Sequence, residues 1–174
     1  MTLFKPKYYV RNYQNISIDR LKKQGIQLLL CDIDNTLVAW NDPHSNDKVK
    51  AFIQKMENAG IHIALCSNAR PSRAKKFSQD LGVEIVFPLS FKPLQHNFKK
   101  AMAHYHVRPD QTAIVGDQLL TDMLGGNIAG VYTILTAPIT EDDKLDTRIN
   151  RFFEKFIYRH YEKKNEFKKG DFDD

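Results

Sequence analysis

Short apolar runs alternate along the chain with longer segments in which apolar residues recur every three or four positions. The runs predict five strands, at residues 26–33, 61–66, 83–87, 112–115 and 131–135. The periodic segments between them predict four helices, at residues 49–59, 71–81, 93–105 and 122–129. Strands that alternate with helices at this spacing are typical of an α/β fold, and we expect a doubly wound (Rossmann-like) parallel sheet of about five strands.

The two ends of the chain lie outside this alternation. The predicted core spans about residues 24–137, with a basic segment before it at 1–23 and a basic amphipathic helix and tail after it at about 140–174. A length of 174 residues fits a single domain. We expect residues 1–13 and 163–174 to be the least ordered parts of the chain.

Polar residues gather where the predicted strands end. Because the carboxyl ends of parallel strands meet at one edge of the sheet, we expect four segments to lie close together there, at residues 32–36, 67–70, 90–92 and 116–122. Asp32 and Asp34 stand two residues apart at the end of a buried strand, which is costly unless a cation binds between them. A divalent cation bridged to a phosphate would satisfy both carboxylates.

The sequence at residues 32–37, Asp-Ile-Asp-Asn-Thr-Leu, has the form D-x-D-x-T followed by an apolar residue. This motif is the signature of the haloacid dehalogenase (HAD) phosphatases, and the chain resembles that superfamily. Three further features of the superfamily follow in order, each at a predicted strand end: Ser67, Lys92-Pro93, and Gly116-Asp117 with Asp122 five residues later. Taken singly, these residues are also explained as turn formers, helix caps or surface groups.

The resemblance implies an enzyme that hydrolyses phosphomonoesters through an aspartyl-phosphate. Asp32 is then the nucleophile, and Asp34 is the general acid and base. The implied cofactor is Mg²⁺, held by the Asp32 and Asp117 carboxylates and the main-chain carbonyl of Asp34.

The remaining motif residues are assigned to the substrate phosphate by the same resemblance. These phosphate-binding residues are Thr36, Ser67, Asn68 and Lys92. Asp122 is expected to support the metal-bound waters or Lys92 without itself being a metal ligand.

The spacing of the motifs leaves no room for a cap domain, which many HAD enzymes close over small substrates. Thirty residues separate Thr36 from Ser67, and twenty-four separate Ser67 from Lys92. Each interval is already filled by one predicted helix and one predicted strand. We therefore expect an open site that accepts a macromolecule or a headgroup presented on a surface.

In finer detail the chain resembles the capless subclass IIIA and its bacterial YqeG-like branch, in the stretches C-D-I-D-N-T-L, S-N-A-R, K-P and G-D-Q-L-L-T-D. Related mitochondrial and plastid enzymes dephosphorylate phosphatidylglycerophosphate to phosphatidylglycerol. The resemblance implies a lipid-headgroup phosphatase in the cytoplasm, working at the inner face of the membrane.

Charge is spread unevenly along the chain, whose formal net charge is +5. Residues 1–23 carry six basic groups and one acidic group, and residues 148–169 carry eight basic and three acidic groups. Both ends also contain aromatic residues among the basic ones, a composition typical of membrane-interface segments. The alternatives are that the C-terminal aromatic stripe packs on the sheet, and that the charge is ordinary solvated surface.

Two other functions remain open. The basic ends are compatible with a binding module for RNA, for example on the ribosome, and nucleic acid is not excluded as a partner. An open HAD site also admits other large or soluble phosphorylated substrates, including phosphoproteins and nucleic-acid ends. Oligomeric state is not indicated by the sequence.

Cysteines and histidines do not suggest a different chemistry. Cys31 and Cys66 form no C-x-x-C pair, so we expect buried thiols and a reducing cytoplasmic compartment. The six histidines lack the spacing of a zinc site.

Overall fold

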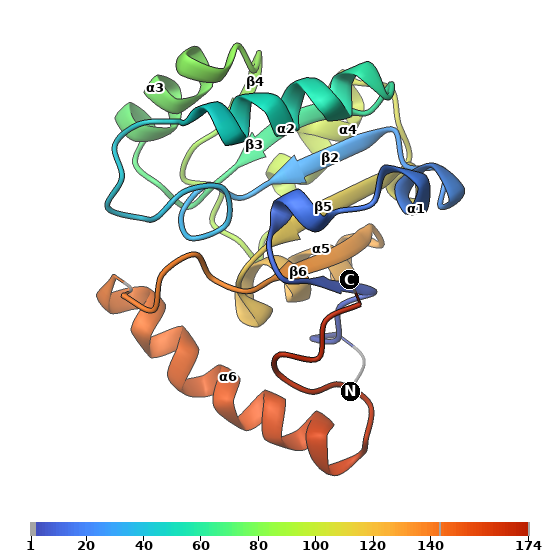
Figure 1. Cartoon of the computed structure of the whole chain (residues 1–174), viewed down its shortest axis with the longest axis vertical. Coiled ribbons are helices and arrows are strands. Elements are labelled where there is room, and N and C mark those ends of the chain that lie inside the picture. Colours follow the sequence, from blue (N-terminus) through green and yellow to red (C-terminus); the bar gives the residue numbers. More distant parts are fainter. Residues whose placement is uncertain (1–2, 143, 174) are drawn as a thin grey trace.

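Six parallel strands form the central sheet of the computed structural model, which describes residues 3–142 and 144–173 (Figure 1). In chain order the strands are β1 (Tyr8–Val10), β2 (Leu28–Cys31), β3 (His62–Cys66), β4 (Ile85–Phe87), β5 (Thr112–Gly116) and β6 (Tyr132–Thr136). Across the sheet they lie in the order β1-β6-β5-β2-β3-β4. The predicted α/β class and parallel sheet are thus confirmed.

The strand order reverses direction between β2 and β5. From β2 the chain moves outward to β3 and β4, then returns to the other side of β2 and continues through β5 to β6. Loops that leave a sheet at such a switch point diverge and leave a crevice at the carboxyl ends of the strands. Asp32 follows β2 and Asp117 follows β5, so this crevice lies between the first and last predicted motifs.

Helices cover both faces of the sheet because the strand residues alternate in direction. Leu29 and Cys31 face the layer of α1 (Ile18–Lys23), α2 (Asp47–Asn58) and α3 (Pro71–Leu81). Leu28 and Leu30 face α4 (His96–His104) and α5 (Leu124–Ala129). Three short elements complete the list: η1 (Tyr13–Asn15), η2 (Pro109–Gln111) and the π-helical η3 (Leu119–Met123). Nearly continuous apolar runs are therefore buried on both sides, as expected for parallel strands.

The N-terminal segment is ordered where disorder was expected. Tyr8, Tyr9 and Val10 are buried, and β1 adds a sixth strand beside β6. The expectation of low order is therefore wrong for the described residues 3–13, because these aromatic side chains enter the core instead of solvent. Residues 1 and 2 lie outside the described part of the chain. A second difference concerns α4, which begins at His96 and not at the predicted Pro93.

The C-terminal segment was also expected to be poorly ordered, and this too is wrong for the described residues up to 173. The long helix α6 (Leu145–Lys163) runs along the lower edge of the molecule, and the tail after it returns to β1 (Figure 1). The ring of Tyr9 lies 5.3 Å from that of Phe167 and 4.6 Å from that of Phe172. The Asp173 N–H donates to the Tyr9 carbonyl at 2.7 Å, and the Tyr9 N–H donates to Asp173 Oδ2 at 2.8 Å. The tail thus covers the outer edge of β1, which would otherwise expose unpaired backbone groups.

The aromatic residues of α6 were expected either to pack on the sheet or to lie at a membrane interface, and the structure buries one of them and exposes three. Tyr161 is fully buried, whereas Phe152, Phe153 and Phe156 are each more than half exposed. In the described part of the chain, no helix combines the length and the apolar character that crossing a bilayer requires.

Candidate active site

The first motif continues the ladder of β2 and then turns sharply. The Asp32 N–H donates to the Val115 carbonyl at 3.0 Å, so Asp32 is fixed at the carboxyl end of the sheet and is almost completely buried. Asn35 has φ +62°, in the left-handed region that asparagine adopts more readily than most residues, and its N–H donates to the Val38 carbonyl at 2.7 Å. This turn carries Thr36 back toward the sheet, where its hydroxyl donates to Asp117 Oδ1 at 3.3 Å.

Lys92 reaches from the loop after β4 into the centre of the site. Its ammonium group lies 2.6 Å from Asp32 Oδ1 and 2.7 Å from Asp122 Oδ1, and the side chain is buried. The Lys92 N–H donates to Asn68 Oδ1 at 3.0 Å, and the Ser67 hydroxyl accepts from the Ala69 N–H at 3.2 Å. The loops after β3 and β4 are therefore joined beside Asp32.

Three carboxylates meet at this point. Oxygen atoms of Asp32, Asp117 and Asp122 all lie within 4.8 Å of one another. The approach of Asp122 depends on Gly116, because a Cβ atom there would lie 2.1 Å from Asp122 Cγ. Glycine at this position lets η3 bring the Asp122 carboxylate against the end of β5. Asp122 Oδ2 also accepts from the Gln118 N–H at 3.2 Å.

One cation and one acid that the sequence analysis missed complete the surroundings of these carboxylates. The Arg151 guanidinium, from α6, pairs with the Asp117 carboxylate and donates to the Asp117 carbonyl at 2.6 Å. Arg151 also pairs with Glu154 at 3.0 Å, and Glu154 accepts from the Leu119 N–H at 2.5 Å. The only sequence signal for this pair is an Arg and a Glu three residues apart on a helix, which more often marks an exposed ion pair.

Asp34 is not part of the three-carboxylate cluster and has its own pair of cations. Its Oδ1 accepts from Arg73 Nε at 2.7 Å, and its Oδ2 pairs with the Lys144 ammonium. Arg73 comes from α3 and Lys144 precedes α6, so two helices hold the side chain predicted to act as general acid. Neither cation was identified from the sequence: Arg73 follows the S-N-A-R segment on a helix, where an arginine is ordinary, and Lys144 lies beyond the last motif.

The inner cluster carries more negative than positive charge. Among the described residues that contact one another there, four carboxylates face two cations: Asp32, Asp117, Asp122 and Glu154 against Lys92 and Arg151. The excess corresponds to the charge of one divalent cation. Hard carboxylate oxygens are the ligands that Mg²⁺ prefers. The residues present therefore fit a divalent metal.

Burial changes the protonation of this cluster. Burial raises the pKa of Asp117 to about 8, although the Arg151 charge opposes the change. It raises the pKa of Asp32 to about 6, against the effect of the Lys92 charge. Burial alone would lower the pKa of Lys92, but the charges of Asp122 and Asp32 outweigh it and raise the pKa. The metal-free site therefore holds protons that a bound cation would displace.

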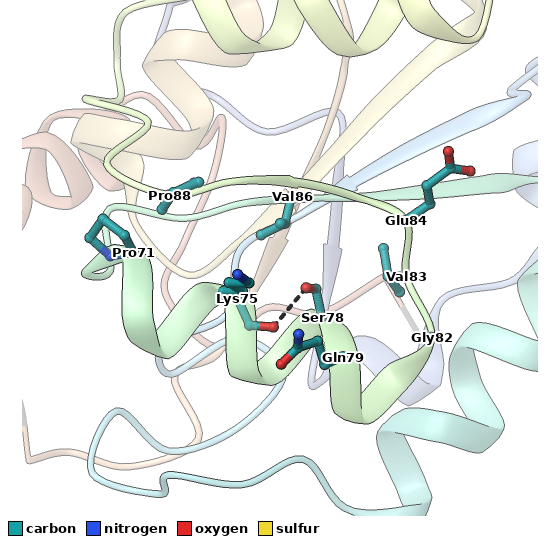
Figure 2. Close-up of a pocket in the computed structure, with 9 residues that line it drawn as sticks. All are labelled: Pro71, Lys75, Ser78, Gln79, Gly82, Val83, Glu84, Val86 and Pro88. Carbon is teal, nitrogen blue, oxygen red and sulfur yellow. Dashed lines mark hydrogen bonds between the residues drawn. The ribbon is translucent and has the colours of Figure 1, made fainter.

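Two surface hollows lie away from these carboxylates. One is an open groove of about 560 Å³ between α3 and β4, and Figure 2 shows Pro71, Lys75 and Val86 among its walls. Within it the Ser78 hydroxyl donates back to the Lys75 carbonyl of the same helix. The second, of about 610 Å³, lies beside the N-terminal segment. Neither is lined by a carboxylate of the three-carboxylate cluster.

Comparison with known proteins identifies relatives of this chain. A family model described as mitochondrial PGP phosphatase matches residues 1–140. A probable phosphatase of Bacillus subtilis, YqeG, is 34% identical over 154 residues, which cover 88% of this chain and 89% of the relative. Phosphatidylglycerophosphate phosphatase 1 of Arabidopsis thaliana, from chloroplasts and mitochondria, is 25% identical over 148 residues, covering 80% of this chain and 42% of that protein.

Solved structures share the fold at lower identity. The cobalt-bound deoxy-D-mannose-octulosonate 8-phosphate phosphatase of Haemophilus influenzae has a TM-score of 0.55 at 19% identity, covering 67% of this chain and 81% of the other. A HAD subfamily IIIA hydrolase of Legionella pneumophila has a TM-score of 0.51 at 15% identity, covering 74% of each chain.

Proposed function

Because this chain belongs to the mitochondrial PGP phosphatase family and is a capless phosphatase of the HAD type, we propose that it uses Mg²⁺ to dephosphorylate phosphatidylglycerophosphate. The observation that carries the chemistry is the buried cluster in which Lys92 joins Asp32 to Asp122 beside Asp117. The lipid substrate is supported by the family and by the Arabidopsis relative. We also propose that the protein acts in the cytoplasm.

In this proposal Asp32 attacks phosphorus and the bond from phosphorus to the glycerol oxygen breaks. Lys92 holds the Asp32 carboxylate in place and contributes positive charge beside the phosphoryl oxygens. Ser67 and Asn68, on the neighbouring loop, are assigned to the same oxygens. When bound, Mg²⁺ supplies the charge that lets an anionic nucleophile approach an anionic phosphate. Asp32 and Asp117 would hold it with the Asp34 carbonyl, and Asp122 lies close enough to assist.

Asp34 moves the protons in both halves of the reaction. In the first half its carboxyl group donates a proton to the departing glycerol oxygen. In the second half the resulting carboxylate takes a proton from water, whose oxygen attacks phosphorus and releases Asp32 and inorganic phosphate. The ion pairs with Arg73 and Lys144 fix the side chain of Asp34, so we assign these cations the task of positioning it, and the proton donated in the first half is the one taken from water in the preceding turnover.

The test is phosphate release from phosphatidylglycerophosphate in mixed micelles, with Mg²⁺ or with a chelator, beside a panel of soluble sugar phosphates and nucleotides. We expect turnover of the lipid to exceed that of the panel, to require Mg²⁺ and to vanish in Asp32→Asn. Asp110→Asn is the matched control, because Asp110 is exposed and its side chain pairs with Arg108.

Two outcomes would change the assignment. Hydrolysis of the soluble panel alone, with the same dependence on Asp32, would keep the mechanism and remove the lipid substrate. Absence of hydrolysis under every condition would favour a binding module, for which salt-dependent RNA binding that persists in Asp32→Asn is the diagnostic result.

A further inference from the structure

Most of the exposed apolar side chains lie in segments that also contribute residues to the active site. Among the described residues, ten large apolar side chains are exposed, and eight of them belong to three segments that also contribute to the active site. These eight are Leu89, Phe91 and Leu94 in the loop that carries Lys92, Ile139 in the segment after β6, and Ile149, Phe152, Phe153 and Phe156 on α6. Patches of this kind, next to a site, mark surfaces that bind something apolar.

Helix α6 is apolar on the side that faces away from the protein. Its inner side packs with Tyr161 and the buried Glu154, while its outer side presents Ile149, Phe152 and Phe156, each 53–55% exposed. The Phe152 ring contacts those of Phe153 and Phe156, with centroids 5.6 and 5.4 Å apart. Figure 1 shows this helix at the periphery of the molecule, with its long axis along the surface. Helices normally bury their apolar face against the protein, so the exposed side chains leave apolar surface on α6 that a partner can cover.

The charges around this stripe favour one kind of partner. The exposed charged residues between positions 148 and 163 of α6 are four cations and one acid: Arg148, Lys155, Arg159 and Lys163 against Glu162. Aromatic residues flanked by cations are typical of helices that lie at the surface of anionic bilayers. Pairing with a second copy of the same face would oppose like charges, so self-association is disfavoured.

The helix that carries the exposed stripe also carries residues that contact the catalytic groups. Lys144, which precedes α6, pairs with Asp34, and Arg151, in its second turn, pairs with Asp117. Phe91 and Leu94 flank Lys92 on the opposite loop and are 65% and 62% exposed. Phe91 has φ +49°, which a bulky residue adopts only at a cost. The exposed side chains thus belong to the same segments that carry Lys92, Lys144 and Arg151 to the site.

We propose that α6 docks this protein on anionic phospholipid bilayers, with the outer stripe (Ile149, Phe152, Phe153 and Phe156) inserted at the boundary between headgroups and acyl chains. Docking presents the open site to headgroups, so a phosphomonoester need not leave the bilayer to be hydrolysed. The inference deepens the proposed function and rests on it for its purpose, while the binding itself is measured without turnover.

The experiment is flotation of the full chain with vesicles of phosphatidylcholine alone or mixed with phosphatidylglycerol. We expect binding to the mixed vesicles, weakened by salt. The double variant F152S/F156S should reduce the apparent affinity on the order of tenfold or more, because two exposed rings no longer enter the interface. Arg159→Glu should reduce it by at least roughly fivefold through lost attraction to anionic lipid.

The matched control is Ile128→Gln, which changes an exposed isoleucine of α5, outside the docking surface, and should leave binding unchanged. Unchanged melting temperatures of all variants verify that the changes act on binding and not on folding. Asp32→Asn should bind vesicles like the wild type, since docking does not need the nucleophile.

Three results would overturn the proposal. They are no binding of wild type to anionic vesicles, equal binding of F152S/F156S and wild type, and a wild-type oligomer in solution that the same double change dissociates. Vesicle binding without phosphatidylglycerophosphate turnover would keep the docking and remove the proposed substrate. Turnover in detergent micelles without vesicle binding would keep the proposed substrate and remove the docking.

Discussion

We expect Mg²⁺ binding at neutral pH to release about one proton from the site, and metal affinity to rise with pH. In the metal-free protein, burial raises the pKa of Asp117 to about 8 and that of Asp32 to about 6. At pH 7 these values correspond to about 0.9 proton on Asp117 and about 0.1 on Asp32. A divalent cation requires both carboxylates in ionised form, so both fractions are displaced when it binds.

The size of the effect changes with pH in a defined way. Near pH 5 both groups are protonated, and release approaches about two protons. Near pH 9 both are ionised, and release approaches zero. The apparent dissociation constant for Mg²⁺ should therefore fall by about tenfold per pH unit around pH 7, more steeply below pH 6 and hardly at all above pH 9.

Isothermal titration calorimetry measures this directly. The same titration in buffers with different ionisation enthalpies gives the number of protons released from the slope of apparent enthalpy against buffer enthalpy. Asp110→Asn, at an exposed site, should give the wild-type slope. A slope near zero at pH 7, with an affinity that is constant between pH 6 and 8, would refute the reasoning and show that the buried carboxylates are already ionised without metal.

Three further predictions concern stability and the shape of the site. Gly116→Ala should abolish phosphatase activity and lower the free energy of unfolding by about 1–3 kcal/mol, measured by urea titration, because its Cβ would collide with Asp122; full activity would contradict the packing described. A chain that stops before residue 167 should lose roughly 2–4 kcal/mol, since Tyr9 loses two ring contacts and the bonds to Asp173; an unchanged urea midpoint would show that the tail contributes nothing. The melting temperature of metal-free protein should fall as pH rises from about 5 to about 9, because carboxyl groups with raised pKa values bind protons more tightly in the folded state, and Mg²⁺ should restore it most at high pH; a flat profile would argue against the raised values.

The sequence predicted best what depends on local pattern. Strands β2 and β3 could be predicted because they are buried on both faces, which leaves a continuous apolar run in the sequence. The motif residues could be found because they stand at the ends of these runs. The three residues of β1 give no comparable signal, because their pairing depends on β6 and on Asp173, far away along the chain. Short strands of this kind are specified by tertiary contacts more than by propensity.

The surroundings of the site were harder to predict for a different reason. In α6, Glu154 is buried and Phe152 is exposed, the reverse of what hydropathy suggests for a helix on a sheet. Periodicity locates the stripe but does not say which side of the helix meets the protein. The inward side of α6 carries Arg151 and Glu154, and the pairing of Arg151 with Asp117 that favours this orientation is visible only when both residues are placed in space.

The tail that covers β1 has a consequence for how the chain is made. Tyr9 leaves the ribosome 164 residues before its partner Asp173. Until Asp173 has been synthesised, the outer edge of β1 has no tail to pair with, and an open strand edge is available to any other extended chain nearby. This edge is therefore protected only after the 164 residues that follow Tyr9 have been made, and a bulky sequence inserted beside Asp173 would lie at the point where the tail covers the sheet.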